Sequence, residues 1–175
     1  MSIFLTSKFT ALRVLGLFIS LSFINPQQSA AQEEISLEEF ESIEGKWTGS
    51  LTYLDYQTQA PFSMPAELVV EKGKKQGQLL LQYVYPNEPK ANSKGKLTRS
   101  KDGTSINGNK IVSRRVLENQ DLEIQSQYTG KDDNKKALIR TTYVFGAKQL
   151  IIRKEVQFSD TEAWIKRNEY QFNRK

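Results

Sequence analysis

The chain of 175 residues contains no cysteine and no histidine. The first absence excludes disulfides and thiolate chemistry, and the second excludes histidine-based catalytic pairs and histidine-ligated haem. Carboxylates remain, but they gather near the start, as in Glu33-Glu34 and Glu38-Glu39, and at Asp132-Asp133 in a predicted turn. Acid–base catalysis needs two carboxyl groups in different environments of one cleft. We therefore expect a protein that is not an enzyme and that holds no metal or cofactor.

A long apolar run is also missing from everything that follows the first 31 residues. Lys8 and Arg13 precede a short apolar run, Val14–Ile24, and the small residues Ser29-Ala30-Ala31 follow it. This order is typical of a secretory signal peptide, and the run is shorter than the roughly 20 residues of a spanning helix. The sequence predicts a signal peptide over 1–31, a domain over 32–175 and a periplasmic or secreted protein without a lipid anchor. The alternative is a retained N-terminal anchor.

A strong excess of charge of one sign is absent as well. The formal net charge is +5, and removing the leader's two basic residues leaves 23 basic against 20 acidic residues. Such a balance gives no electrostatic footprint for nucleic acid. We expect a monomer with no nucleic-acid partner and no membrane span.

Helix signals are confined to the start of the predicted domain, where Ser36 and Glu39 form a capping-box pattern before a turn or two over Leu37–Ser42. From Lys46 onward, short runs rich in Val, Ile, Leu, Tyr and Thr alternate with turn residues, which predicts strands. The predicted strands are Trp47–Tyr56, Ala66–Glu71, Gln78–Tyr85, Gly95–Ser100, Lys110–Leu117, Leu122–Thr129, Ala137–Phe145, Gln149–Phe158 and Ala163–Phe172, with a brief extra strand around Thr104–Asn107.

Tight turns such as Asn107-Gly108 make consecutive strands antiparallel neighbours. Nine or ten such strands must protect their edges, and closure into a barrel removes those edges. The predicted fold class is therefore all-β, an antiparallel up-and-down meander barrel of 8–10 strands with a short N-terminal helix. A two-sheet sandwich is the alternative.

The segment from Gly45 to Trp47 follows the predicted helix and begins the first strand. This Gly-x-Trp resembles the signature of the lipocalin-like, or calycin, barrels, in particular secreted bacterial proteins of that architecture. The resemblance implies that the helix closes one end of the barrel and that Trp47 packs inside against a basic side chain of the last strand. That side chain would be Lys166 or, with a register break, Arg167. The simpler interpretation is that Trp47 is an ordinary core residue.

The loop Gln57–Pro65 is long and, in the resembled barrels, a lid would lie at this place. Inward strand positions also include polar residues that need partners; these are Asp55, Ser126, Thr141, Lys154 and Asn168. An inward Lys154 calls for an anion, either Asp55 or a ligand carboxylate such as that of a fatty acid. The predicted ligand-binding residues are Leu51, Tyr53, Phe62, Leu81, Tyr83, Ile124 and Lys154.

These patterns favour a binding protein that holds a small hydrophobic or amphipathic molecule in the barrel, with apolar walls for affinity and a few polar groups for orientation. A second hypothesis is a structural or interaction protein of the cell envelope whose barrel is filled by its own side chains. A third is an enzyme built on carboxylates and tyrosines. An open interior would favour the binding protein, and a filled interior would favour the interaction protein. Two titratable groups that converge in one cleft would favour the enzyme.

Overall fold

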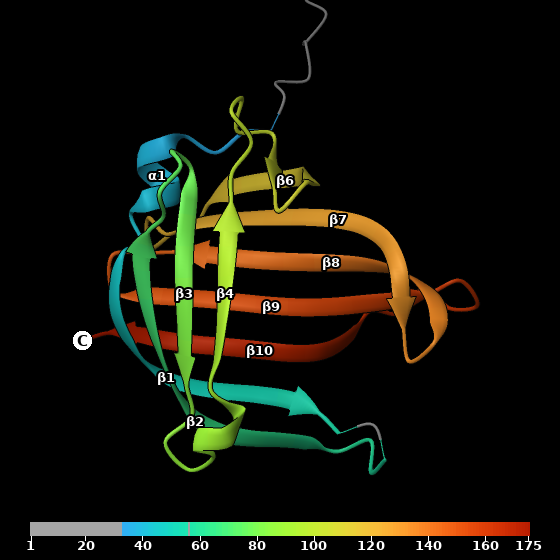
Figure 1. Cartoon of the computed structure of the whole chain (residues 1–175). Coiled ribbons are helices and arrows are strands. Elements are labelled where there is room, and N and C mark those ends of the chain that lie inside the picture. The colour runs from blue at the N-terminus through green and yellow to red at the C-terminus, as the bar shows by residue number, and fades with distance from the viewer. Residues whose placement is uncertain (1–32, 56) are drawn as a thin grey trace, which may run out of the picture. The chain divides into compact units, whose positions relative to one another are not determined.

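A computed structural model describes residues 33–55 and 57–175, all within one compact unit, Gln32–Lys175. The predicted signal peptide lies outside the described residues. Figure 1 shows a strongly curved sheet with a short helix beside one end. The elements are α1 (Leu37–Glu41), β1 (Gly45–Leu54), β2 (Pro61–Lys72), β3 (Gln78–Val84), the 3-10 turn η1 (Pro89–Ala91), β4 (Ser93–Thr98), β5 (Ser105–Ile106), β6 (Asn109–Val116), β7 (Leu122–Asp132), β8 (Lys135–Phe145), β9 (Gln149–Phe158) and β10 (Ile165–Arg174).

The ten strands form one antiparallel sheet in the order β4-β3-β2-β1-β10-β9-β8-β7-β6-β5. Each neighbour in this order is also a neighbour in sequence, except that β10 returns to pair with β1. The predicted meander is thus confirmed, as is the brief extra strand. The sandwich alternative is wrong, because all ten strands belong to one sheet.

The barrel is nearly closed. Its last seam is made at one point, where Arg99 after β4 forms a bridge with Ile106 of β5. Two backbone hydrogen bonds flank the bridge, from Asn107 N to Thr98 O (2.7 Å) and from Ser100 N to Ser105 O (3.0 Å). No described strand pairs with the rest of the outer edge of β4. The sheet is therefore sealed near the helix and open along the remainder of this seam.

Helix α1 forms where the capping box predicted it. The Ser36 hydroxyl accepts a bond from Glu39 N (3.1 Å), and the Glu39 carboxylate accepts one from Ser36 N (2.8 Å). Phe40 of the helix and Ile43 after it are fully buried in the barrel's main core. Because helix dipoles and propensity stabilise so short a helix little, this apolar packing holds it in place.

One prediction about this region is wrong. The loop Gln57–Pro65 was expected to form a lid, but β2 begins at Pro61, and Asp55 N bonds to Ala60 O (3.0 Å) to close a tight turn. Met64 faces the core and Phe62 is paired with Tyr53. The prolines misled the prediction, because β2 tolerates Pro61 at its first position and Pro65 within it.

Among the described residues, no helix is long and apolar enough to cross a membrane.

Candidate functional site

The end of the barrel beside α1, here called the closed end, is sealed around Trp47. The Trp47 side chain is 0% exposed, and its Nε1 donates a hydrogen bond to Ile43 O (2.9 Å). The Arg174 guanidinium lies over the indole ring, with 4.2 Å between its central carbon and the ring centroid. Arg174 also donates to Ser42 O (2.8 Å), Glu44 O (2.7 Å) and Ala147 O (2.8 Å), and thereby joins the helix end to two turns.

The predicted basic partners of Trp47, Lys166 and Arg167, are therefore wrong. The reason lies in strand direction. β10 runs antiparallel to β1, so the residue opposite Trp47 near the start of β1 must be near the end of β10, and the register gives Arg174. Lys166 and Arg167 lie at the beginning of β10, at the other end of the barrel. Gly45 holds its predicted place at the start of β1, with a positive φ of 134° that favours glycine.

A β-bulge in β10 changes the inward set of that strand. The register shifts between Lys166 and Asn168, so Arg167 is the additional residue. Lys166 points outward and pairs with Glu169 (2.9 Å), whereas Arg167 is 6% exposed and lies against the Phe158 ring. The register break that would favour Arg167 over Lys166 as an inward residue thus exists. It lies at the opposite end of the barrel from Trp47, however, so Arg167 does not contact Trp47.

Four polar side chains form a continuous row across the inner face of four adjacent strands. In the ladders, Ser126 of β7 pairs with Thr141 of β8, Thr141 with Lys154 of β9, and Lys154 with Asn168 of β10. Directly paired residues project from the same face of a sheet. The next residue along this line is Tyr53 of β1, which pairs with Asn168. We call these four residues the polar row.

The row separates two apolar clusters. Toward the closed end lies the main core, which includes Ile124 and Tyr143 two positions away from Ser126 and Thr141. Toward the other end lies a small cluster of Ala137, Ile139 and Val156, with Phe158 and Ile165 packed against it. The closed end is thus filled by the main core, the small cluster covers the wall of β8 to β10 beyond the row, and polar side chains cross the inner wall between the two clusters.

Beside the polar row, on its closed-end side, lies a surface that we call the aromatic floor, made of Leu51, Tyr83, Ile152 and Tyr170. These residues pack against the core but remain only partly buried. The Tyr83 and Tyr170 rings are 5.0 Å apart, and the Tyr170 hydroxyl shares a 2.8 Å hydrogen bond with the Tyr85 hydroxyl. Because β3 and β10 are not sheet neighbours, these contacts cross the barrel interior.

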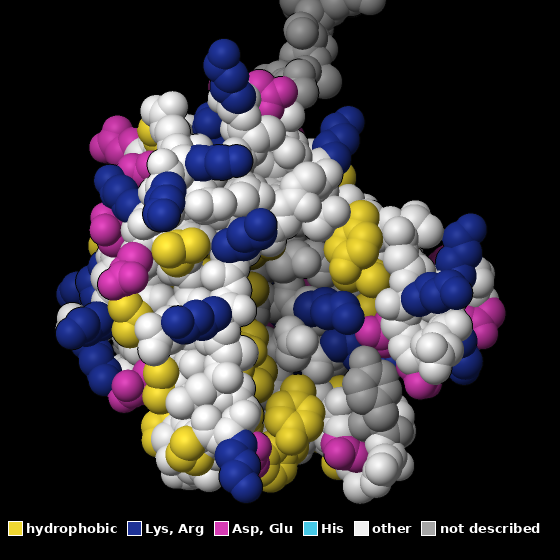
Figure 2. Space-filling view, viewed as in Figure 1, with side chains coloured by type: hydrophobic (Ala, Val, Ile, Leu, Met, Phe, Trp, Pro, Cys, Tyr) yellow, Lys and Arg dark blue, Asp and Glu magenta, His cyan; other side chains and the backbone are white. Residues whose placement is uncertain are grey.

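Figure 2 shows the molecule hollowed between the surface over β3 and β4 and the surface over the far part of β7 and β8. This hollow coincides with the unsealed part of the seam beside β4. Leu51, Tyr83 and Tyr170 point into the barrel and remain partly exposed. We take this hollow, with its aromatic floor and polar row, as the candidate site.

The charged part of the site is centred on Asp132, whose side chain is 2% exposed. It accepts hydrogen bonds from Lys154 Nζ (3.0 Å) and Arg167 Nε (2.6 Å). Burial alone would raise the pKa of Asp132, but the hydrogen bonds and charges of the two cations outweigh burial and hold the pKa below its ordinary value.

The expected pairing of Lys154 with Asp55 is wrong. Asp55 Oδ1 instead accepts from the Gln57 and Thr58 backbone N–H groups (2.9 and 2.7 Å) and so caps the exposed turn between β1 and β2. Asp132 supplies the anion because the hairpin after β7 places it on the inner face, next to β9.

Ser126 is the most deeply buried member of the polar row. It is 0% exposed, and its Oγ has no hydrogen-bond partner among the described residues. It and Thr141 lie close enough to the Tyr143 phenol to lower its pKa, yet burial dominates and raises that pKa to about 12. Burial also raises the pKa values of Tyr83 and Tyr170. The site therefore offers phenols that stay neutral well above pH 7.

The predicted ligand-binding residues divide into two groups in the structure. Leu51, Tyr53 and Tyr83 point inward and are partly buried. Phe62, which pairs with Tyr53, is 48% exposed. Leu81 and Ile124 lie in the buried core, and Lys154 lies in the polar row. The Tyr53 and Phe62 rings contact each other with centroids 5.5 Å apart.

The sequence interpretation missed Arg174, Asp132 and Tyr170. Strand direction would have indicated Arg174, as argued above. Asp132 was assigned to a turn, although it is the last residue of β7. Tyr170 follows the bulge, which alternation alone does not locate.

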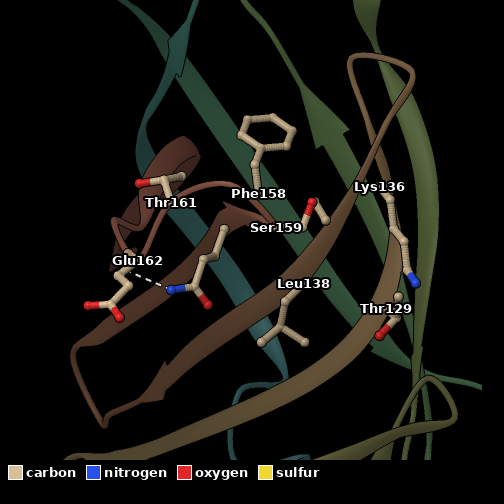
Figure 3. A pocket seen from close by; sticks show the side chains of 9 residues that line it. Thr129, Lys136, Leu138, Phe158, Ser159, Thr161 and Glu162 are labelled. Atoms are coloured by element: carbon tan, nitrogen blue, oxygen red, sulfur yellow. Dashed lines mark hydrogen bonds between the residues drawn. The ribbon is translucent and has the colours of Figure 1, made fainter.

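A separate depression of about 480 Å³ lies at the hairpin ends of β7, β8 and β9. Figure 3 shows Lys136 and Glu162 on opposite sides of it, with Leu138 and Phe158 between them. Gln157 Nε2 donates to Glu162 O (2.7 Å) and closes its wall. In the part of the chain that the structure describes, no group of three or more acidic residues is placed to hold a metal ion.

Comparison with known proteins supports the fold. No family model and no curated protein matches the chain. Among solved structures, the chain is similar to the crystal structure of Rv2717c from M. tuberculosis, with 12% sequence identity and a TM-score of 0.53. The match covers 82% of this chain and 99% of the other. At this identity the likeness shows a shared barrel fold and nothing about a ligand.

Proposed function

We propose that this protein is an exported, lipocalin-like binding protein that holds a small amphipathic molecule in the hollow of its barrel. The observation that carries the proposal is the polar row lying beside the partly exposed aromatic floor, inside a barrel that is otherwise well packed. Binding sites for small molecules typically combine apolar walls with a few polar groups that fix orientation.

The relation to the lipocalin-like barrels is part of the proposal. It is supported by the buried Trp47 after a capped helix and by the stacked Arg174 from the last strand. Export is supported by the order of basic, apolar and small residues over 1–31. Intact mass measurement of the exported protein tests this part, and retention of residues 1–31 would contradict it.

Native mass spectrometry of protein purified from its own host tests the proposed binding. We expect a retained species of low mass that is lost under denaturing conditions. Substitution of Tyr83 by Ala should reduce its retention, because the phenol ring is part of the aromatic floor. The matched control is Leu80→Ala, which removes an exposed side chain from the outer face of the same strand, β3, and should leave retention unchanged.

The second candidate function is that of an envelope interaction protein, which the filled closed end favours. All the largest fully buried side chains among the described residues, Trp47, Phe40 and Phe172 first among them, belong to this filled core. Absence of any retained species, together with a stable complex with another envelope protein, would favour this second function.

A further inference from the structure

We propose that the outer edge of β4 binds an extended acidic segment of another protein, which joins the sheet as an added antiparallel strand. The segment carries acidic residues opposite Lys94 and Lys96 and an apolar residue opposite Gly95. This inference goes beyond the proposed small-molecule binding and does not depend on it.

The backbone of β4 offers unused hydrogen-bonding groups along this edge. β4 is the last strand on its side of the sheet, and apart from the bridge at Arg99 no described strand pairs with its outer edge. Both backbone groups of Thr98 point to that edge, because Thr98 N donates to Asn107 Oδ1 (2.9 Å) and Thr98 O accepts from Asn107 N (2.7 Å). The direction of these groups alternates along an antiparallel strand, so the backbone groups of Lys96 and Lys94 point to the same edge. Both residues are exposed, and an extended peptide can bond to them.

The side chains of this edge favour a partner of negative charge. Lys96 pairs with Leu80, which is 43% exposed, so Lys96 and Lys94 two positions earlier lie on the outer face of the sheet. Neither lysine has an ion pair with a described residue. Figure 2 shows Lys and Arg side chains on the surface over β3 and β4 that borders the hollow. Carboxylates directly opposite the two lysines are favoured, because opposite charges stabilise a cross-strand pair.

A second copy of this chain is a less favourable occupant. Lysine on an edge strand commonly protects a sheet against edge-to-edge association. If two β4 edges paired antiparallel about Gly95, Lys94 of each strand would lie opposite Lys96 of the other. Like charges directly opposite each other destabilise a ladder. The lysines that disfavour an identical strand attract an acidic one, so we assign the edge to an acidic partner and not to a dimer.

Gly95 leaves space for one apolar side chain of the partner. It pairs with the buried Leu81, and the inner face of β4 therefore has no side chain at this position. The atoms nearest to a Cβ at Gly95 would be those of the Tyr83 ring (3.6 Å) and the Leu81 side chain (3.8 Å). Because the backbone groups of Gly95 point toward β3, a residue opposite it on an added strand forms a non-hydrogen-bonded pair, in which side chains lie close together. An aromatic ring there would cover the glycine and contact Tyr83.

Fluorescence anisotropy at low ionic strength tests the proposal, with the purified protein and the labelled peptide Thr-Thr-Glu-Phe-Glu-Thr-Thr. We expect saturable binding of this peptide and none of its Lys-Phe-Lys counterpart. The double variant Lys94→Gln/Lys96→Gln should weaken binding by about 2- to 30-fold, because it removes two cross-strand charge pairs. The matched control, Lys74→Gln/Lys75→Gln, removes the same charge from exposed lysines of the turn between β2 and β3 and should leave the affinity unchanged.

Methylation of the peptide backbone separates strand addition from attraction between charges. Methyl groups on both Glu nitrogens remove the N–H groups that would bond to the Lys94 and Lys96 carbonyls, and they should weaken binding by about 10-fold or more. A methyl group on the Phe nitrogen, which faces away from β4, should change the affinity by less than about 3-fold. Equal losses for the two methylated peptides, or no loss for either, would overturn strand addition.

Amide hydrogen exchange locates the bound peptide. The Lys94 and Lys96 amides should exchange more slowly in the complex, whereas the Gly95 amide, which faces β3, should be protected with and without peptide. Slowed exchange elsewhere, with none at Lys94 and Lys96, would overturn the assigned edge. Binding to phosphatidylglycerol vesicles without binding of the peptide would assign the lysines to a membrane surface and would also overturn it. These outcomes are independent of any species retained in native mass spectrometry, which tests the proposed function separately.

Discussion

Replacement of Trp47 by Ala should be the most destabilising single truncation at the closed end. The side chain is completely buried, and truncation of a buried Trp to Ala typically costs about 3 to 5 kcal/mol. The change also leaves the Ile43 carbonyl without its indole donor, a loss of about 1 kcal/mol, and removes the ring beneath Arg174. Since these effects overlap, we expect the free energy of unfolding to fall by about 4 kcal/mol, toward the upper part of that range.

Urea unfolding followed by circular dichroism measures this change, and an unchanged slope would show that only stability has altered. The chain's other tryptophan, Trp164, provides the control. It is partly exposed, and Arg140 lies over its ring at 4.0 Å. Trp164→Ala should therefore cost only about 1 kcal/mol. A loss below about 1 kcal/mol for Trp47→Ala, or equal losses for the two variants, would refute the sealed closed end.

Three further predictions test the site and the strand register. Asp132→Asn should make the free energy of unfolding less dependent on pH in acid. The pKa of Asp132 in the folded protein lies below its ordinary value of 3.8, so its ionised carboxylate stabilises the protein above pH 3.8, and this contribution disappears as the pH falls through the folded pKa. Urea midpoints at pH 7 and pH 3 measure this, and parallel losses in both proteins would contradict it. Gly49→Ala should lower the free energy of unfolding by more than about 3 kcal/mol, because the added Cβ would lie 1.9 Å from Gln171 O. Gly95→Ala places its Cβ 3.6 Å from the Tyr83 ring and should change that free energy by under about 1 kcal/mol. Similar urea midpoints for the two variants would argue against this register. Tyr170→Phe should not alter the phenol absorbance titration near pH 10, because burial raises the pKa of Tyr170; a lost step there would show an accessible phenol.

The strands were predictable because each has its own local signal. Alternating apolar positions and turn pairs such as Asn107-Gly108 mark the hairpins, and the capping box marks α1. The start of β2 was not predictable in this way, because Pro61 and Pro65 signal a loop. Only pairing with β1, which satisfies the neighbouring backbone groups, makes the extended conformation favourable there.

The candidate site was predictable in part. Alternation placed Ser126, Thr141, Lys154 and Asn168 on inner faces, but it could not show that they share one row, since that depends on the register between strands. Lys154 was expected to need an anion, and it has one. That anion is Asp132, 22 residues earlier in the chain, and such a pairing has no local signal.

The polar row is difficult to explain if folding is the only requirement on the barrel. Apolar side chains line the inner wall on both sides of the row, and the row interrupts this lining. Buried polar groups without partners cost free energy, so an apolar residue in place of Ser126 would be expected to favour the folded state. The bulge adds a further polar side chain to the interior. It brings Arg167 inside, beside Asp132, in addition to Asn168 of the row. Register and bulge together therefore place a line of polar side chains and a buried ion pair inside a largely apolar barrel, an arrangement that apolar packing alone does not require.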